Sequence, residues 1–303
     1  MPCGVPIFLY IRGAMKNFML YLAALSAVAC SKPAAEFHEE TEEQEFPEPE
    51  VIIPAEDSIE ARITLKGPSE AVAVRHTDIF VYGTGGLQKL EKHVRIDSLP
   101  REFHCKVTKG VKIFVAICNC PYGFNLTALD KYESMELLAF NFSEDDPGTP
   151  LLSGKTIGEG EIWLAPLLCK VVLEEISNAL DGYELLESPR IYLTGANPSS
   201  EILRTGEYRP KEEFGGVVEA RLPYDVGFFS QYPRTTLYCY PNDTPDDILG
   251  CIRTVFHFEC HIGGEKRDYE IPLPQFTRGA VLGIKLAINS PEEYYQSVSL
   301  NYP

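Results

Sequence analysis

The sequence lacks an apolar run long enough to cross a membrane as a helix, and it has little positive charge. A membrane-spanning helix needs ~20 apolar residues, and the run at residues 18–29 is shorter than that. Only 27 Lys and Arg stand against 44 Asp and Glu, which leaves a net charge of −17. Nucleic-acid phosphates require a basic surface, so this balance excludes nucleic acid as a partner. It also disfavours electrostatic docking on anionic lipid.

A disulfide framework is missing as well, although the chain has nine cysteines. Cys3 lies in the N-terminal leader, and Cys30 ends the apolar run. The other seven are odd in number and irregularly spaced, which is not typical of a disulfide framework. A single disulfide bridge remains an alternative, but the sequence does not identify which two cysteines would form it. The seven are Cys105, Cys118, Cys120, Cys169, Cys239, Cys251 and Cys260.

No enzyme motif is found. Gly154-Lys155-Thr156 resembles the end of a phosphate-binding loop, but Thr149 stands where the template requires glycine, and no helix follows. We interpret this stretch as an ordinary loop. His104-Cys105 lies in no nucleophile elbow. Spacing alone does not exclude a glycosidase-like carboxylate pair, but nothing favours one. We therefore predict no enzyme, no catalytic residues and no cofactor.

Two groups of residues look like metal ligands when read as a string. Cys118-Asn119-Cys120 is expected to place two thiols on one face at a strand end, but no second CxC or CxxC completes a site. In HFECH, His257 and His261 share a face of a strand and stand ~13 Å apart, too far to chelate one zinc ion. We interpret the two histidines as a surface pair opposite the core residue Cys260, and we predict no metal site.

Residues 15–30 have the order of a bacterial lipoprotein signal. Met15 and Lys16 provide a start-like methionine with one positive charge, a short apolar core follows, and small residues lead to Cys30. Ala27 stands where leucine is usual. We predict a signal peptide at residues 1–29, with Met15 as an alternative start, and lipidation of Cys30 (palmitate) in the outer membrane. The alternative is an uncleaved anchor or a core helix.

The stretch after Cys30 is strongly acidic. Eight glutamates and no Lys or Arg lie between residues 36 and 50, together with Pro47 and Pro49. Such a segment buries little and repels itself into an extended form. We interpret residues 30–55 as the lipidated cysteine and an acidic tether.

From residue 59 onward the pattern predicts strands. Ile59, Ala61, Ile63 and Leu65 alternate with polar residues up to Lys66, as in a half-buried strand. Gly263-Gly264 is a strong hairpin signal. The other candidate strands, separated by turn residues, are 78–82, 87–96, 102–107, 111–118, 162–176, 190–196, 216–222, 235–240, 252–262, 267–273 and 280–288.

Helices are few in this pattern. Only residues 127–140, with helically spaced leucines, predict one. Many short strands with few helices indicate β-sandwiches rather than βαβ units. We predict an all-β fold with two tandem β-sandwich domains, at residues 56–158 and 159–303.

This arrangement resembles the fimbrillin-type lipoproteins of Bacteroidales, in the FimB/Mfa-like family of type V pilus anchor and accessory subunits. The likeness rests on the signal, the tether and four stretches that are similar to family segments. These are DIFVYGTGGL (78–87), GVKIFVAICNCP (110–121), PLLCKVVLEEI (166–176) with its central Lys170, and TTLYCYPN (235–242). Cys120 beside the Asn-x-Pro segment is unusual, and the arginine often found before Lys170 is absent.

The resemblance implies two transthyretin-like sandwiches without catalysis, and assembly by strand exchange. A first strand is removed after Arg or Lys, and a neighbour's C-terminal strand fills the groove. Here the covering strand would be Ile59 to Lys66 or residues 51–54. Arg62 and Arg75 are the candidate cut sites, although solvent-facing arginines are common. The tail at 297–303 is either a donor or an ordinary edge strand.

The resemblance further implies a lipid-anchored pilus subunit at the cell surface, with other pilus subunits and the outer membrane as partners. A short, permanently lipidated member is expected to be the anchor that keeps its first strand. The alternative is a surface glycan-binding lipoprotein. Such proteins present exposed aromatic side chains, and this chain has one tryptophan, Trp163, but sixteen tyrosines, including Tyr294 and Tyr295.

Overall fold

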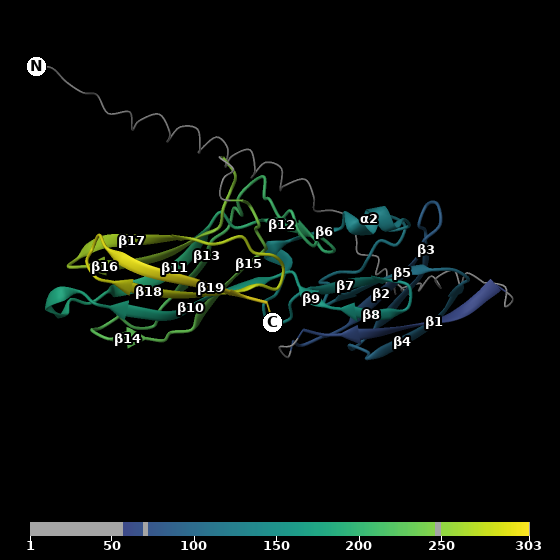
Figure 1. Ribbon diagram of the computed structural model, residues 1–303, viewed down its shortest axis with the longest axis horizontal. Coiled ribbons are helices and arrows are strands. Elements are labelled where there is room, and N and C mark those ends of the chain that lie inside the picture. The colour runs from purple at the N-terminus through teal and green to yellow at the C-terminus, as the bar shows by residue number, and fades with distance from the viewer. Residues whose placement is uncertain (1–56, 69–71, 246–249, 303) are drawn as a thin grey trace, which may run out of the picture. The chain divides into compact units, whose positions relative to one another are not determined.

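The computed structural model describes residues 57–68, 72–245 and 250–302, and strands dominate it (Figure 1). The predicted all-β class is confirmed. The predicted signal peptide, Cys30 and the tether lie outside the described residues, and the described residues belong to one compact unit. No helix within the described ranges is long and apolar enough to cross a membrane. The division into two domains at residue 158 stays a prediction.

Two sheets are built from strands of the first half of the chain. The smaller has the order β4-β1-β8, and the larger has the order β3-β2-β5-β7-β9. Between them lies a core of apolar side chains that includes Ile63, Phe103 and Phe114. The strands are β1 (Ser58–Lys66), β2 (Thr77–Gly83), β3 (Leu90–Ile96), β4 (Glu102–Thr108), β5 (Lys112–Cys118), β7 (Leu152–Ile157), β8 (Gly160–Trp163) and β9 (Ala165–Pro166).

The larger sheet is covered on its second face too. Phe80, Tyr82 and Val115 on this face pack against Tyr132 and Met135 of the short helix α2 (Tyr132–Glu136). Figure 1 shows α2 on the side of this sheet away from β1 and β4. Burial on both faces explains why β2 and β5 are continuous apolar runs rather than alternating ones.

Helix α2 is much shorter than the predicted helix at 127–140, and that prediction is wrong in its extent. After α2 the chain forms strand β6 (Ala139–Asn141), which pairs with β12 (Ser199–Glu201). Leu137, counted toward the apolar face of the predicted helix, is 68% exposed. Pairing with a distant strand therefore replaces the helix that the leucine spacing indicated. The 3-10 helix η2 (Phe142–Glu144) follows β6.

The second half of the chain forms two further sheets around another core. One has the order β14-β10-β18-β19, with β15 also paired to β10, and the other has the order β13-β11-β16-β17. Their inner faces share one large apolar cluster that includes Val171, Phe256 and Ile284. The elements are β10 (Cys169–Asn178), η3 (Asp181–Tyr183), β11 (Glu187–Thr194), β13 (Val218–Arg221), β14 (Ser230–Gln231), β15 (Thr235–Cys239), β16 (Val255–Ile262), β17 (Glu265–Pro272), β18 (Val281–Ile288) and β19 (Tyr294–Asn301).

Two local predictions have opposite outcomes. The hairpin at Gly263-Gly264 is confirmed: β16 and β17 pair directly up to Ile262 and Glu265, and both glycines have positive φ, of 58° and 82°. The single strand predicted at 162–176 is wrong, because the chain divides there into β8, β9 and β10. Pro166 lacks the N–H that a continuous ladder would need.

Gly154-Lys155-Thr156, interpreted as a loop, lies within strand β7. Its partner is β5, with Gly154 opposite Ala116. A Cβ atom at Gly154 would collide with the Trp163 carbonyl oxygen, so the glycine permits the close approach of β8. The stretch therefore serves sheet packing.

Candidate functional site: the first strand and its flanks

Strand β1 lies between two neighbours rather than at an edge. It pairs antiparallel with β4, with Ile63 opposite Phe103 in the ladder, and parallel with β8, with Leu65 opposite Ile162. Leu65 of β1 also donates its backbone N–H to the carbonyl of Arg101, the residue just before β4. Taking β1 away would therefore leave two strand edges facing one another across an empty position.

The inner face of β1 is a complete part of the core. Ala61, Ile63 and Leu65 are 3%, 0% and 4% exposed. They pack in the cluster that also holds Ile79 of β2 and Phe114 of β5. The period-two alternation of the sequence produces this face, since successive side chains of a strand point to opposite sides. A replacement strand would have to supply apolar side chains at the same alternate positions.

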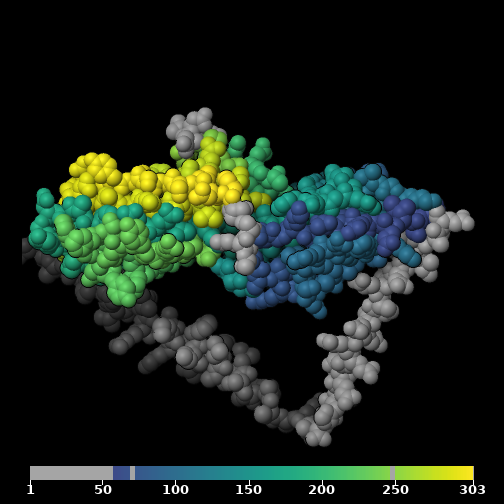
Figure 2. All heavy atoms as spheres, turned by 60° about the horizontal axis from the view of Figure 1, so that its bottom comes forward, coloured from purple at the N-terminus to yellow at the C-terminus, as the bar shows by residue number. Residues whose placement is uncertain are grey.

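The outer face of β1 carries ion pairs at the surface, where its purple atoms are seen in Figure 2. Arg62 contacts Glu102 of β4 at 2.6 Å, and Lys66 contacts Glu161 of β8 at 2.7 Å. The Lys66 ammonium also lies 4.6 Å from the centre of the Trp163 ring. The Arg62 guanidinium lowers the pKa of the Glu102 carboxyl. Exposed ion pairs of this kind contribute little to the free energy of unfolding.

The two candidate cut sites differ in their surroundings. Arg62 lies within β1, and its backbone is paired to His104 in the ladder with β4. Arg75 lies after the strand, in the connection to β2, and 69% of its side chain is exposed. A protease needs an accessible peptide, so the position of Arg75 is the more suitable one, while Arg62 requires that β1 first leave the sheet.

The connection at Arg75 is nevertheless held in place by Asn119. The Asn119 Oδ1 accepts from the Arg75 N–H at 2.8 Å, and its Nδ2 donates to the carbonyls of Ala73, at 2.8 Å, and Pro150, at 3.0 Å. The Asn119 N–H donates to the His76 carbonyl. Asn119 has a φ of 61°, a conformation that asparagine tolerates better than most residues. The side chain of Asn119 therefore holds the connection before the candidate cut, and its backbone N–H holds the residue after the cut.

At the other end of the described chain, β19 is an edge strand. It pairs antiparallel with β18, from Val281 opposite Asn301 to Ile288 opposite Tyr294. Tyr294, Val298 and Leu300 pack only partly against the core, and the remaining side chains of the strand are exposed. Figure 2 shows the end of the chain, in yellow, spread over the surface.

Solved structures of similar fold include fimbrial proteins of Bacteroidales. The fimbrilin FimA of Porphyromonas gingivalis is 11% identical, with a TM-score of 0.57, over 80% of this chain and 96% of that one. The tip fimbrial protein Mfa3 of the same species, truncated at its C-terminus, is 12% identical, with a TM-score of 0.55, over 80% and 99%. A fimbrial assembly protein of Parabacteroides distasonis is 15% identical, with a TM-score of 0.52, over 80% and 99%.

The chain has the fimbrillin fold. The resemblance that the sequence predicted is thus confirmed at the level of the fold. No family model matches the sequence, and no curated protein is significantly similar to it.

Most cysteines among the described residues are buried in the core. Cys118 packs in the cluster between the first two sheets, whereas Cys120 packs on the other face of the larger sheet. The expectation that the two thiols share a face is wrong, because the positive φ of Asn119 turns the chain between them. Burial raises the pKa of both thiols to about 11. Burial likewise raises the pKa of Cys105, which makes it a poor nucleophile at neutral pH.

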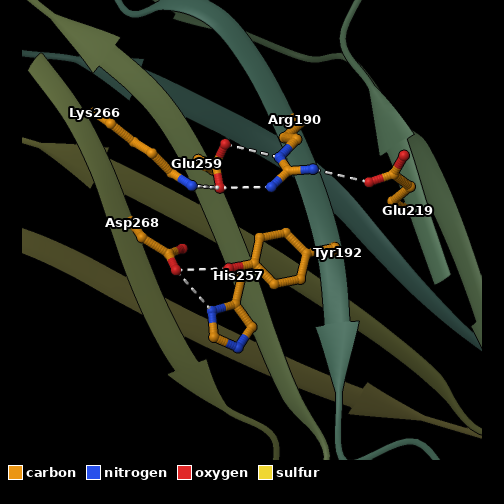
Figure 3. Close-up of polar contacts among 7 residues, drawn as sticks. All are labelled: Arg190, Tyr192, Glu219, His257, Glu259, Lys266 and Asp268. Atoms are coloured by element: carbon orange, nitrogen blue, oxygen red, sulfur yellow. Dashed lines mark hydrogen bonds and ion pairs between the residues drawn. The ribbon is translucent and has the colours of Figure 1, made fainter. Parts of the chain in front are cut away.

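The outer face of the β13-β11-β16-β17 sheet carries a polar network that the sequence did not reveal (Figure 3). Glu259 accepts from Arg190 and also contacts Lys266 at 2.8 Å. These two cations lower the pKa of Glu259 to about 2. The interpretation of His257 as a surface residue is wrong: it is only 6% exposed, because the Tyr192 ring stacks over it with centroids 4.4 Å apart.

Aromatic side chains also gather at the surface near η3. Tyr183 and Phe229 are 78% and 79% exposed. The Phe228 ring lies between them, with its centroid 5.3 Å from that of Tyr183 and 5.2 Å from that of Phe229. Large contiguous patches of exposed apolar surface mark sites where ligands or partners bind. The aromatic residues of the two loops were not singled out from the sequence, since only folding brings residue 183 next to residue 228.

Proposed function

We propose that this chain is a non-enzymatic, lipid-anchored pilus subunit at the cell surface, and that it acts as an anchor or accessory subunit. In this proposal an anchor keeps β1 together with its lipid, whereas in an accessory subunit that is cut after β1 a strand of a neighbouring subunit takes the place of β1. The fimbrial neighbours described above share the fold, and their names support the pilus role for this chain.

The position of β1 is the observation that supports this function best. The strand is bounded on both sides by paired edges, β4 and β8, and its three inner side chains are almost completely buried. An incoming strand would gain two hydrogen-bonded ladders and three apolar pockets at alternate positions. Backbone pairing would supply affinity, and the pockets would supply register.

Arg75 is our proposed cut site, in preference to Arg62. Cleavage after Arg75 would separate the whole of β1 from β2, while cleavage after Arg62 would leave half of the strand behind. A chain that acts as an anchor would keep β1 in place, and the hydrogen bonds of Asn119 to the connection favour retention. The two roles therefore differ in whether Arg75 is cut.

The second element of the proposed strand exchange is β19, near the end of the described residues. β19 is an edge strand with alternating Val298 and Leu300, so it is suited to leave its sheet and to pair elsewhere. We propose it as a donor strand for a neighbouring subunit, with an ordinary edge strand as the alternative.

The experiment for the pilus role is a binding assay with candidate pilins. The purified full chain is treated with an Arg-specific protease, and the fragments are sequenced at their N-termini before mixing. Treated chain that associates with a pilin supports the proposal, and an Arg75→Gln variant serves as the matched control. A chain that binds no pilin, cut or uncut, would contradict the pilus role.

The membrane anchor is proposed at Cys30, which lies outside the described residues. Cys30→Ala is expected to release the protein from the outer-membrane fraction, because acylation requires the thiol. Cys3→Ala is the matched control and should leave fractionation unchanged. Membrane association that survives Cys30→Ala would exclude a lipid on this cysteine.

A second candidate function is binding of surface glycans. The observation that favours it is the exposed group of Tyr183, Phe228 and Phe229, because sugar rings stack on exposed aromatic faces. The test is retention on a panel of polysaccharides, with Phe229→Ala compared with Tyr295→Ala, another exposed aromatic residue. Retention lost only in Phe229→Ala would support glycan binding, and no retention of the wild type would exclude it.

A further inference from the structure

His257, Asp268 and Glu270 lie together on the outer face of the β13-β11-β16-β17 sheet. Their imidazole nitrogen and carboxylate oxygens all lie within 4.8 Å of one another. His257 and Glu270 are direct partners across the β16–β17 ladder, and Asp268 stands two residues from Glu270 on the same face. We propose that these three residues form a binding site for a divalent transition-metal ion, with zinc as the best fit.

The imidazole of His257 is already oriented for this role. The Thr194 hydroxyl lies 2.9 Å from its Nε2, and the parallel Tyr192 ring holds the imidazole plane. Its Nδ1 faces Asp268, with 3.3 Å between Nδ1 and the Oδ2 atom. A metal-binding histidine commonly has its second ring nitrogen held by a hydrogen bond, which fixes the tautomer and the ring direction. Thr194 can supply that bond here.

The first carboxylate is oriented as well, and the second can move. The Tyr192 hydroxyl donates to the Asp268 Oδ2 at 2.6 Å, a contact that Figure 3 shows beside the imidazole. Glu270 is exposed, so its side chain can rotate toward the other two groups. Tetrahedral zinc with ligands at ~2.1 Å needs ligand atoms ~3.4 Å apart. Rotation of the exposed Glu270 side chain is the movement by which the proposed site would close.

The neighbouring charges restrict the site to these three ligands. Glu259, the nearest other carboxylate on β16, is engaged by Arg190 and Lys266. One imidazole with two carboxylates matches the nitrogen and oxygen ligands of zinc, whereas calcium and magnesium prefer oxygen alone. Three protein ligands leave a fourth position for water or for a donor atom from a partner.

The sequence could not indicate this site because its ligands come from two strands. Within β16 the only histidine pair is His257 and His261, which are too far apart along one strand. The hairpin register instead places Glu270 directly opposite His257. Pairing across the hairpin, not spacing along it, brings the ligands together.

Zinc binding by the full chain tests this proposal. The chain is titrated with zinc chloride in competition with a chromophoric indicator, and its melting temperature is measured with and without zinc. We expect Glu270→Gln to weaken zinc binding at least tenfold and to abolish a zinc-dependent rise in melting temperature. His257→Asn is expected to do the same. Calcium chloride at the same concentration should produce no rise.

His261→Asn and Glu265→Gln are the matched controls. They lie on the same hairpin, outside the proposed site, and should bind zinc as the wild type does. His257→Asn could prevent folding, because the imidazole that it removes is buried. In that case Glu270→Gln, at an exposed position, still tests the proposal. Equal zinc affinity and an equal melting shift in wild type and Glu270→Gln would overturn the proposal. So would a wild type that shows no zinc-dependent shift.

Discussion

The first and last described strands, β1 and β19, are attached to the fold in different ways. β1 has two neighbours and three nearly fully buried side chains, whereas β19 has one neighbour and contacts the core through partly buried side chains only. Loss of β1 would open a slot with two unpaired edges and an uncovered core. Loss of β19 would expose a single edge. A strand of the first kind is suited to be replaced, and one of the second kind is suited to leave.

Core truncation should separate the two strands most clearly. Ile63→Ala removes a fully buried side chain and is expected to lower the free energy of unfolding by ~3 kcal/mol. Leu300→Ala, at a half-buried position of β19, should lower it by ~1 kcal/mol. Urea unfolding followed by the fluorescence of Trp163, the single tryptophan, measures both. Equal losses at the two positions would remove the basis of the comparison.

Arg278 should reveal whether the surroundings of β1 and β19 unfold together. Its guanidinium donates to Ser153 Oγ at 2.9 Å, to the Ile202 carbonyl at 2.8 Å and to the Ala165 carbonyl. Arg278→Met removes these hydrogen bonds, although the Ser153 hydroxyl still donates to the Ile202 carbonyl. The change should lower the free energy of unfolding by ~2 kcal/mol.

The same variant should also separate two transitions. Trp163 reports on β8, next to β1, while circular dichroism reports on all strands. In the wild type the two signals should coincide. In Arg278→Met the Trp163 transition should move away from the other. Coincident curves in the variant would show that other contacts couple the two regions, and Arg209→Met provides a control at another arginine.

A pH series should isolate a group that belongs to neither strand. Burial raises the pKa of Asp145 from an ordinary 3.8 to about 6, so the folded state binds the proton more tightly than the unfolded state. Stability from this group is complete below pH ~4 and is lost as the pH rises through about 6. Asp145→Asn should therefore be more stable than the wild type at pH 8, by up to ~2 kcal/mol. Its Oδ1 can still accept from the Leu151 N–H.

The measurement is the difference in urea midpoint between wild type and Asp145→Asn at pH 4 and pH 8. A difference that stays constant with pH would contradict the assignment. Because Asp145 precedes β7 rather than β1 or β19, the gap between Ile63→Ala and Leu300→Ala should be the same at both pH values.

Asn119 should control how fast the connection after β1 is cut. Asn119→Ala removes the side-chain bonds to Ala73, Arg75 and Pro150, so the connection should open more often. We expect cleavage at Arg75 to become about tenfold faster, a factor that corresponds to ~1.4 kcal/mol. The readout is the appearance of the N-terminus His76 by sequencing. Asn125→Ala, in an exposed turn, is the control, and an unchanged rate in Asn119→Ala would rule out this role.

The sequence predicted local features of this fold well. Alternation at 59–66 predicted β1 and its buried face, and Gly263-Gly264 predicted the hairpin, because both depend only on neighbouring residues. The pairing of β1 with β8 could not be predicted, since Leu65 and Ile162 are brought together only by the whole sheet. For the same reason, the conformation of Asn119 and the burial of His257 could not be predicted from the sequence.

The helix error has a similar origin. Leucine spacing at 127–140 fits a helix, but pairing of β6 with β12, sixty residues away along the chain, takes the backbone from 139 onward. The sequence did not distinguish between the two candidate cut sites, Arg62 and Arg75. Only the structure distinguishes a residue paired within a strand from one in a connection.

Exchange of β1 tests the central claim most directly. The full chain is cut after Arg75, and a fluorescent peptide of residues 57–66 is added in excess while its anisotropy is followed. We predict that the cut chain takes up the peptide and that the uncut chain does not, and that the same peptide carrying Ile63→Asp fails to bind. A cut chain that remains folded but takes up no peptide, or an uncut chain that binds it equally well, would contradict the account of β1 as a replaceable strand.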